Sequence, residues 1–73
     1  MEWMTIKLTD GRRVSFFGYH LTALDRKAIR AMYAAGSNYA TTPQQVYEIK
    51  DGWLIIRHAK QWGGHVSRLE IRE

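Results

Sequence analysis

The sequence predicts an α+β fold in which one helix packs on a mainly antiparallel sheet of about five strands, in the order ββαβββ. Two observations predict this fold. Five segments alternate apolar and polar residues and are separated by turn residues, as strands are. Residues 22–35, between the second and third of these segments, have the periodicity of an amphipathic helix. Because one such helix covers only one face of the sheet, we expect a two-layer sandwich, with a more curled, partly barrel-like sheet as the alternative.

The first two segments, residues 3–9 and 12–19, are predicted to form a hairpin. A three-residue loop that pairs residue 9 with residue 13 places the apolar positions of both strands on one face, whereas a two-residue loop does not. We therefore expect a type I turn followed by a bulge at Gly11.

The helix is predicted over residues 22–35, with Thr22 as N-cap and Asp25 in the position of a capping-box acid. Gly36 is expected to end the helix in the left-handed conformation, and Ser37 to Pro43 is expected to be a polar loop. The predicted buried stripe contains Leu21, Leu24, Ala28, Ala31, Met32 and Ala35, and the opposite side carries Arg26, Lys27 and Arg30.

Residues 45–50, 53–62 and 65–72 are predicted to form a three-stranded meander with two-residue turns at Asp51-Gly52 and Gly63-Gly64. These turns pair residue 50 with 53 and residue 62 with 65, and both pairings select the same apolar face. Such agreement between independent hairpins is a strong indication of structure. The predicted buried face contains Tyr47, Ile49, Leu54, Ile56, Leu69 and Ile71, with His58 as a hydrogen-bonded residue near its end.

The composition limits the classes of protein to consider. A chain of 73 residues is expected to form one domain, residues 1–73, and its lack of cysteine excludes disulfides and thiolate metal sites. No apolar run approaches the roughly 20 residues that span a membrane, and the N-terminus does not resemble a signal peptide. We therefore expect a cytoplasmic protein with no membrane partner.

The net charge of +4 favours polyanionic partners or an acidic protein surface, although it is also an ordinary charge for solubility. The charge falls largely on the predicted outer face of the sheet, where basic side chains alternate with aromatic ones. This face contains Trp3, Thr5, Lys7, Arg13, Ser15, Phe17, Tyr19, Lys50, Trp53, Ile55, Arg57, Val66, Arg68 and Arg72, with Glu48 and Glu70 as its only acids.

Four interpretations of this face stay open. Aromatic rings stack on unpaired bases while Lys and Arg neutralise phosphates, which is typical of nucleic-acid binding. Trp, Tyr and Arg are also the common anchors of protein interfaces, and self-association is a further alternative. Alternatively, the aromatic rings pack on one another beneath arginine stems. The predicted partner-binding residues are Trp3, Lys7, Arg13, Phe17, Tyr19, Trp53, Arg57, Arg68 and Arg72, and Arg26, Lys27 and Arg30 form a second candidate surface.

No pattern typical of catalysis, metal binding or cofactor binding occurs in the sequence. His20, His58 and His65 do not have the spacing of metal ligands, and no serine lies in a nucleophile motif. Glu48 and Glu70 are expected to pair with arginines across strands. We therefore expect a non-enzymatic protein with no catalytic residue, metal or cofactor.

In size, charge and lack of catalytic residues, the chain resembles the small regulators of phages and mobile elements, an analogy of type that no shared motif supports. It implies a regulator that binds a larger host or cognate protein of nucleic-acid metabolism, such as the transcription machinery. The alternative is a domain that binds DNA or RNA directly through the basic and aromatic sheet face.

Overall fold

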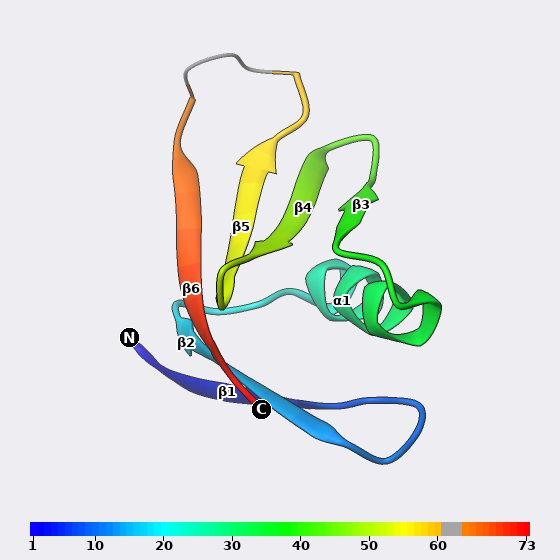
Figure 1. The fold of residues 1–73 in the computed structure, drawn as a ribbon. Helices are drawn as coiled ribbons and strands as arrows, with labels where there is room; N and C mark the ends of the chain where they lie inside the picture. Colours follow the sequence, from blue (N-terminus) through cyan, green and yellow to red (C-terminus); the bar gives the residue numbers. More distant parts are fainter. Residues whose placement is uncertain (61–63) are drawn as a thin grey trace.

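Six antiparallel strands and one helix make up the α+β fold that the computed structural model describes for residues 1–60 and 64–73 (Figure 1). The strand order in the sheet is β1-β2-β6-β5-β4-β3. The elements are β1 (Glu2–Lys7), β2 (Arg13–Gly18), α1 (Ala23–Ala35), β3 (Tyr39–Thr41), β4 (Gln45–Lys50), β5 (Trp53–His58) and β6 (Val66–Arg72).

The sheet bends around the helix, because both of its edge strands come close to α1. On one side, Arg30 Nε of α1 donates a hydrogen bond of 3.1 Å to the carbonyl oxygen of Lys7 in β1. On the other side, β3 lies against α1. Strand β6 connects the two halves of the sheet, since its C-terminal part pairs with β2 and most of its length pairs with β5 (Figure 1). This arrangement corresponds to the curled alternative.

The sheet has one strand more than expected, so the element order is ββαββββ. The predicted polar loop at residues 37–43 was wrong, because Tyr39–Thr41 form β3 and pair with β4. Three residues are too few to give a recognisable alternation. The neighbouring Ser37 also bonds the free side of this strand, since its Oγ donates to Tyr39 O at 2.9 Å and accepts from Tyr39 N at 3.2 Å.

The β4–β5 hairpin confirms its prediction, because Lys50 pairs with Trp53 across a two-residue turn. Asp51 has φ 53° and Gly52 has φ 81°. Two successive residues with positive φ are what a type I′ turn requires.

The register of the β1–β2 hairpin differs from the predicted one by two residues. Gly11 has the expected positive φ, 93°, and its N–H donates to Leu8 O at 3.1 Å. The three-residue loop, however, consists of residues 9–11. Arg13 therefore pairs with Lys7, whereas the predicted register paired it with residue 9. A shift of two residues keeps every side chain on its face, so the predicted apolar face survives.

The predicted register of the β5–β6 hairpin was also wrong. Leu69 pairs with Leu54, whereas the predicted register paired it with residue 58. The register differs because β5 ends at His58 and the connection is longer than two residues. The predicted Gly63-Gly64 turn falls partly outside the described residues. His58 is exposed rather than at the edge of the core, and its Nδ1 accepts from Lys60 N at 3.3 Å.

Both predicted ends of the helix are confirmed, and its buried side is confirmed in part, since Leu21 and Met32 are buried and Ala28 packs against the core. Thr22 Oγ1 accepts from Asp25 N, Asp25 Oδ2 accepts from Thr22 N, and Gly36 ends the helix at φ 64°. The helix is rotated so that Ile29 fills the core, while Leu24 is 65% exposed. Larger side chains bury more apolar area than alanines, which explains this orientation. The core cluster contains Met4, Ile6, Leu8, Val14, Phe16, Leu21, Ile29, Met32, Tyr47, Leu54, Ile56 and Leu69.

The predicted inner face of the meander is confirmed as far as the helix covers it, with Ile49 and Ile71 packed at the margin of the core. In residues 1–60 and 64–73, no helix is long and apolar enough to cross a membrane.

Candidate functional site

The outer face is the side of the sheet that points away from α1. Strand pairing brings eight of the nine predicted partner-binding residues to it: Trp3, Lys7, Arg13, Phe17, Trp53, Arg57, Arg68 and Arg72. Tyr19 does not join them, because β2 ends at Gly18 and Tyr19 lines a cavity near the start of α1.

One part of the outer face is a packed cluster of Trp3, Phe17 and Arg72. Trp3 and Phe17 pair directly across β1 and β2, with ring centroids 5.1 Å apart and planes at 52°. The Arg72 guanidinium carbon lies 4.1 Å from the centroid of the Trp3 ring, which is a cation–π contact. Both rings are half-buried, so these contacts occupy surface that a base or a partner side chain would need.

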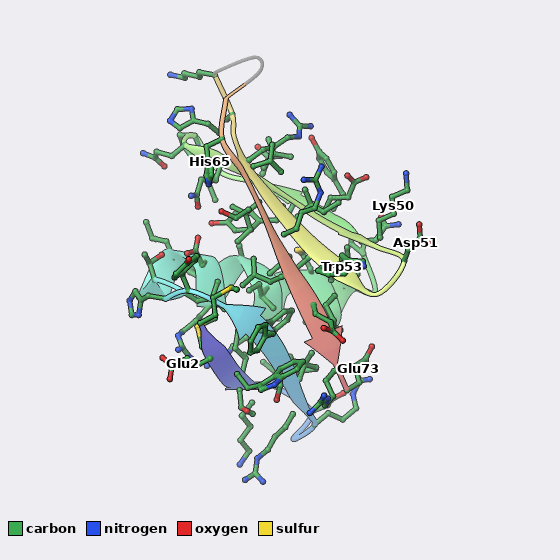
Figure 2. All side chains as sticks on the ribbon, turned by 90° about the vertical axis from the view of Figure 1, so that its left-hand side faces the viewer. Glu2, Lys50, Asp51, Trp53, His65 and Glu73 are labelled. Carbon is green, nitrogen blue, oxygen red and sulfur yellow. The ribbon has the colours of Figure 1, made fainter. Side chains whose placement is uncertain are left out.

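A second part of the outer face is open. Trp53 is 43% exposed and lies beside Lys50 near the β4–β5 turn (Figure 2). A shallow hollow of about 230 Å³ is lined by both of these residues together with Asp51, Ile55 and Arg68. Trp53 pairs with Lys50 on β4 and with Glu70 on β6. An exposed indole is a suitable anchor for an apolar group of a partner.

The basic side chains of the outer face are not neutralised within the part of the chain that the structure describes. There the one ion pair within 4.0 Å joins Arg12 Nε to Asp10 Oδ2, at 2.7 Å in the β1–β2 turn. Hydrogen bonds from the Arg12 backbone and side chain lower the pKa of Asp10. The expected ion pairs of Glu48 and Glu70 are therefore absent among the described residues.

Lys7 and Arg13 are direct cross-strand partners on the outer face. Like charges that face each other across strands are unfavourable for stability. A nearby anion would relieve this repulsion.

Tyr39 is a further member of the outer face that the sequence did not predict. Tyr39 in β3 pairs with Glu48 in β4 and is 48% exposed, so it adds a second accessible ring. Its segment had been predicted to be a loop, and only the pairing with β4 gives it a side of the sheet.

The second candidate surface, on α1, is divided. Arg30 donates to Lys7 O, as described above, and Arg26 Nε donates to Leu21 O at 3.4 Å. Both side chains are half-buried, whereas Lys27 is exposed. Two of the three cationic groups thus bond to the chain's own backbone, which weakens this surface as a candidate.

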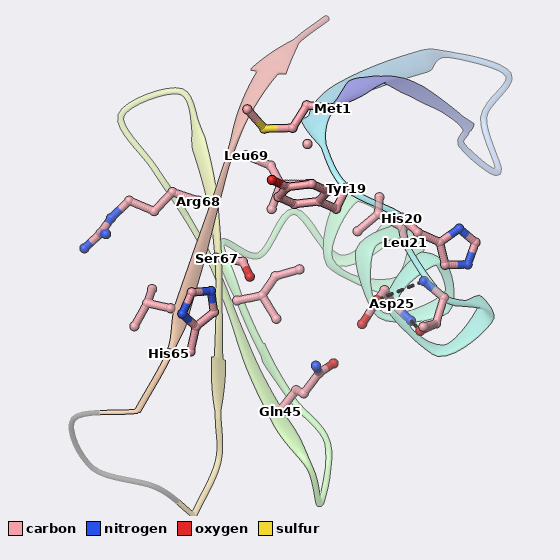
Figure 3. Close-up of a pocket in the computed structure, with 14 residues that line it drawn as sticks. Met1, Tyr19, His20, Leu21, Asp25, Gln45, His65, Ser67, Arg68 and Leu69 are labelled. Atoms are coloured by element: carbon pink, nitrogen blue, oxygen red, sulfur yellow. Dashed lines mark hydrogen bonds between the residues drawn. The ribbon is translucent and has the colours of Figure 1, made fainter.

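A cavity of about 410 Å³ lies between the start of α1 and the end of the inner face that the helix leaves uncovered (Figure 3). Its apolar walls include Leu21, Ile56 and Leu69. Its polar lining groups are Tyr19, His20, Thr22, Asp25, Gln45, His65, Ser67 and Arg68.

Asp25 connects this cavity to the core. It is 6% exposed, and its Oδ1 accepts a hydrogen bond of 2.6 Å from the Tyr47 hydroxyl. Burial, together with the hydrogen bond and negative charge of Asp25, raises the pKa of Tyr47. The Tyr47 oxygen also lies 2.6 Å from Gln45 Oε1. The sequence analysis recognised Asp25 only as a helix cap.

His20 and His65 line the cavity, while His58 lies outside it. Among residues 1–60 and 64–73, no group of three or more His, Asp or Glu side chains is placed to hold a metal ion.

No protein-family model, curated protein or solved structure matches the chain. The chemistry of two places therefore bears on function: the outer face with Trp53, and the cavity with Asp25.

Proposed function

We propose that this chain is a non-enzymatic regulator that binds a larger protein through the outer face of its sheet. The observation that carries the proposal is the hollow at Trp53, which an exposed indole lines together with Lys50 and Arg68 on the side away from α1. Trp and Arg are the residues that most often dominate binding energy at protein interfaces.

The charge of the outer face supports a partner with an acidic surface. The face carries Lys7, Arg13, Lys50, Arg57, Arg68 and Arg72, and none of them has an ion-pair partner among the described residues. Complementary charge speeds association and fixes the register of an interface. We propose a cytoplasmic partner from nucleic-acid metabolism, such as the transcription machinery, in keeping with the small regulators that the chain resembles in size, charge and lack of catalytic residues.

An affinity capture with matched variants tests this proposal. The immobilised full chain should retain one protein in stoichiometric amount from a lysate of the cells that carry it. Trp53→Ala should weaken this binding by about 2 kcal/mol, or roughly 30-fold. Leu24→Ala, which removes another exposed apolar side chain on the opposite side of the molecule, should retain the partner. Absence of a stoichiometric partner, or equal capture by Trp53→Ala, would overturn the proposal.

Direct binding of nucleic acid is the second candidate, favoured by the same unpaired basic residues. It is second because the Trp3 ring already contacts Phe17 and Arg72, which leaves fewer rings for bases to stack on. If all six basic side chains contact phosphates, raising the salt from about 50 to about 200 mM should weaken oligonucleotide binding roughly 10³-fold. A band-shift titration at the lower salt that shows no complex would exclude this candidate.

A further inference from the structure

The cavity beside the start of α1 has the size and lining of a ligand site. Its volume of about 410 Å³ lies in the range of roughly 300–1,000 Å³ that is usual for small-molecule pockets. It lies on the inner side of the sheet, away from the outer face. Tyr19 is 77% exposed and extends from the β2–α1 connection toward β6 across this cavity (Figure 3).

Asp25 gives the cavity a buried carboxylate without a counter-charge. Its two hydrogen-bond donors, the Thr22 N–H at 3.0 Å and the Tyr47 hydroxyl at 2.6 Å, are both neutral. No described Lys, Arg or His nitrogen lies within 4.0 Å of it. The N-terminus of α1 also stabilises this carboxylate, because Asp25 lies in the first turn. Two of its roughly four lone-pair sites remain unused.

Among the described residues, Asp25 is the one acidic side chain that lines the cavity. Met1, which carries the α-amino group, and Arg68 also line it. Figure 3 shows the Arg68 guanidinium pointing away from the cavity, while Asp25 lies on the helix side opposite His65. The positive charge of Arg68 is directed instead to the hollow on the outer face. Asp25 is therefore the group of the cavity that can form an ion pair with a bound cation.

Gln45 and Ser67 supply further acceptors. The Tyr47 hydroxyl has one hydrogen, which it donates to Asp25, so its contact with the Gln45 amide requires a donor on Gln45. Half a turn of that amide lets its NH₂ group donate to Tyr47 and leaves its carbonyl oxygen free. The Ser67 hydroxyl, on β6, lines the same cavity.

We propose that this cavity binds an organic cation: a guanidinium or primary ammonium group on a short apolar stem. Asp25 supplies the counter-charge, Gln45 and Ser67 accept hydrogen bonds, and the Tyr19 ring lies over the cation. The apolar walls at Leu21, Ile56 and Leu69 contact the stem. The cation belongs either to a free small molecule or to an arginine or lysine side chain of another protein. This site is independent of the proposed outer-face function.

Titration of the isotope-labelled full chain with propylguanidine, butylamine and propylurea tests the proposal. Propylurea has nearly the shape of propylguanidine but no charge. The two cations should cause saturable amide shifts in residues 19–25 and 65–69, and propylurea should cause none at the same concentration. A short arginine-containing peptide that binds at least tenfold more tightly than propylguanidine would identify a protein side chain as the source. Equal or weaker binding would identify a free cation.

Three variants separate a site from a general charge effect. Asp25→Asn should abolish the shifts, whereas Asp51→Asn, an equal change of charge in the β4–β5 turn, should preserve them. Asp25→Asn keeps only one of the two oxygens that accept from Thr22 N and the Tyr47 hydroxyl, so its fold is checked by circular dichroism. Tyr19→Ala changes only an exposed side chain and should weaken cation binding about two- to fivefold.

Three results would overturn the proposal: no saturable shift with either cation, equal shifts with propylurea, or unchanged binding by folded Asp25→Asn. If Asp25→Asn does not fold, unchanged affinity of Tyr19→Ala overturns it. None of these results bears on capture through Trp53, so the two proposals fail separately.

Discussion

The Tyr47 hydroxyl on β4 donates a hydrogen bond of 2.6 Å to Asp25 Oδ1 on α1 and so joins the helix to the sheet inside the core. Asp25 also caps the helix through Thr22, so one carboxylate takes part both in starting the helix and in docking it.

We expect Tyr47→Phe to lower the free energy of unfolding by about 1–3 kcal/mol, because Asp25 would lose a donor inside the protein. Urea denaturation would measure this loss. Tyr39→Phe is the control, because that residue is exposed and its change should be within about 0.5 kcal/mol. Equal stability of Tyr47→Phe and the wild type would contradict the prediction.

The stability should fall in alkaline solution because of Tyr47 and Tyr33. Burial raises the pKa of both residues above the ordinary value of about 10. The folded state then holds these protons more tightly than the unfolded state. Their contribution is complete below about pH 10 and is lost as the pH rises toward the folded-state pKa values. The urea concentration at the midpoint of unfolding should fall as the pH rises from about 9 to about 11. This fall should be less steep for Tyr47→Phe than for the wild type. Parallel declines would show that Tyr47 is not responsible.

Gly18 is required where β2 passes Leu69. A Cβ at this position would lie 2.7 Å from Leu69 Cδ2 and 2.8 Å from Leu69 Cγ, and Leu69 is itself buried in the core. We expect Gly18→Ala to destabilise the fold by about 1–3 kcal/mol through overpacking. Leu69→Ala alone should cost about 2–5 kcal/mol. The double variant should be more stable than the sum of the two losses by at least about 0.5 kcal/mol, and strict additivity would argue against the clash.

The two tryptophans of the outer face should behave differently. Trp3 contacts both Phe17 and Arg72, so we expect Trp3→Ala to destabilise the fold by about 1–3 kcal/mol. Trp53 lies in an open hollow, and Trp53→Ala should change stability by no more than about 0.5 kcal/mol. Thermal or urea melts of the two variants would measure the difference. A large loss of stability in Trp53→Ala would mean that its effect on partner capture is indirect.

Ser37 protects the free edge of β3, because its hydroxyl bonds both the N–H and the C=O of Tyr39. We expect Ser37→Ala to speed hydrogen exchange of the Tyr39 amide and to cost about 0.5–1.5 kcal/mol. The amide of Ile49, which donates to Asn38 O on the paired side of β3, serves as the internal reference. Unchanged exchange at Tyr39 would show that the Ser37 bonds do not protect this edge.

Local signals in the sequence were sufficient where a few adjacent residues determine the conformation. The capping box of Thr22 and Asp25, the stop at Gly36 and the Asp51-Gly52 turn depend on groups within four residues of one another. The faces of the hairpins were also predictable, since side chains alternate strictly along a strand. For the same reason, eight predicted binding residues share one face even though two of the three predicted hairpin registers were shifted.

Contacts between distant segments decided the rest. The side of α1 that is buried depends on how Ile29 and Met32 fill the space under the sheet, and periodicity alone allowed a neighbouring stripe with Leu24. Strand β3 exists because β4 pairs with it, and the cavity exists because β5 and β6 extend beyond the helix. The sequence by itself determined the class of fold, the helix ends and the basic, aromatic character of the outer face, because these depend on local geometry and alternation. Only the tertiary structure decided which tryptophan is accessible and that Asp25 faces a cavity, because both depend on packing between residues far apart in the chain.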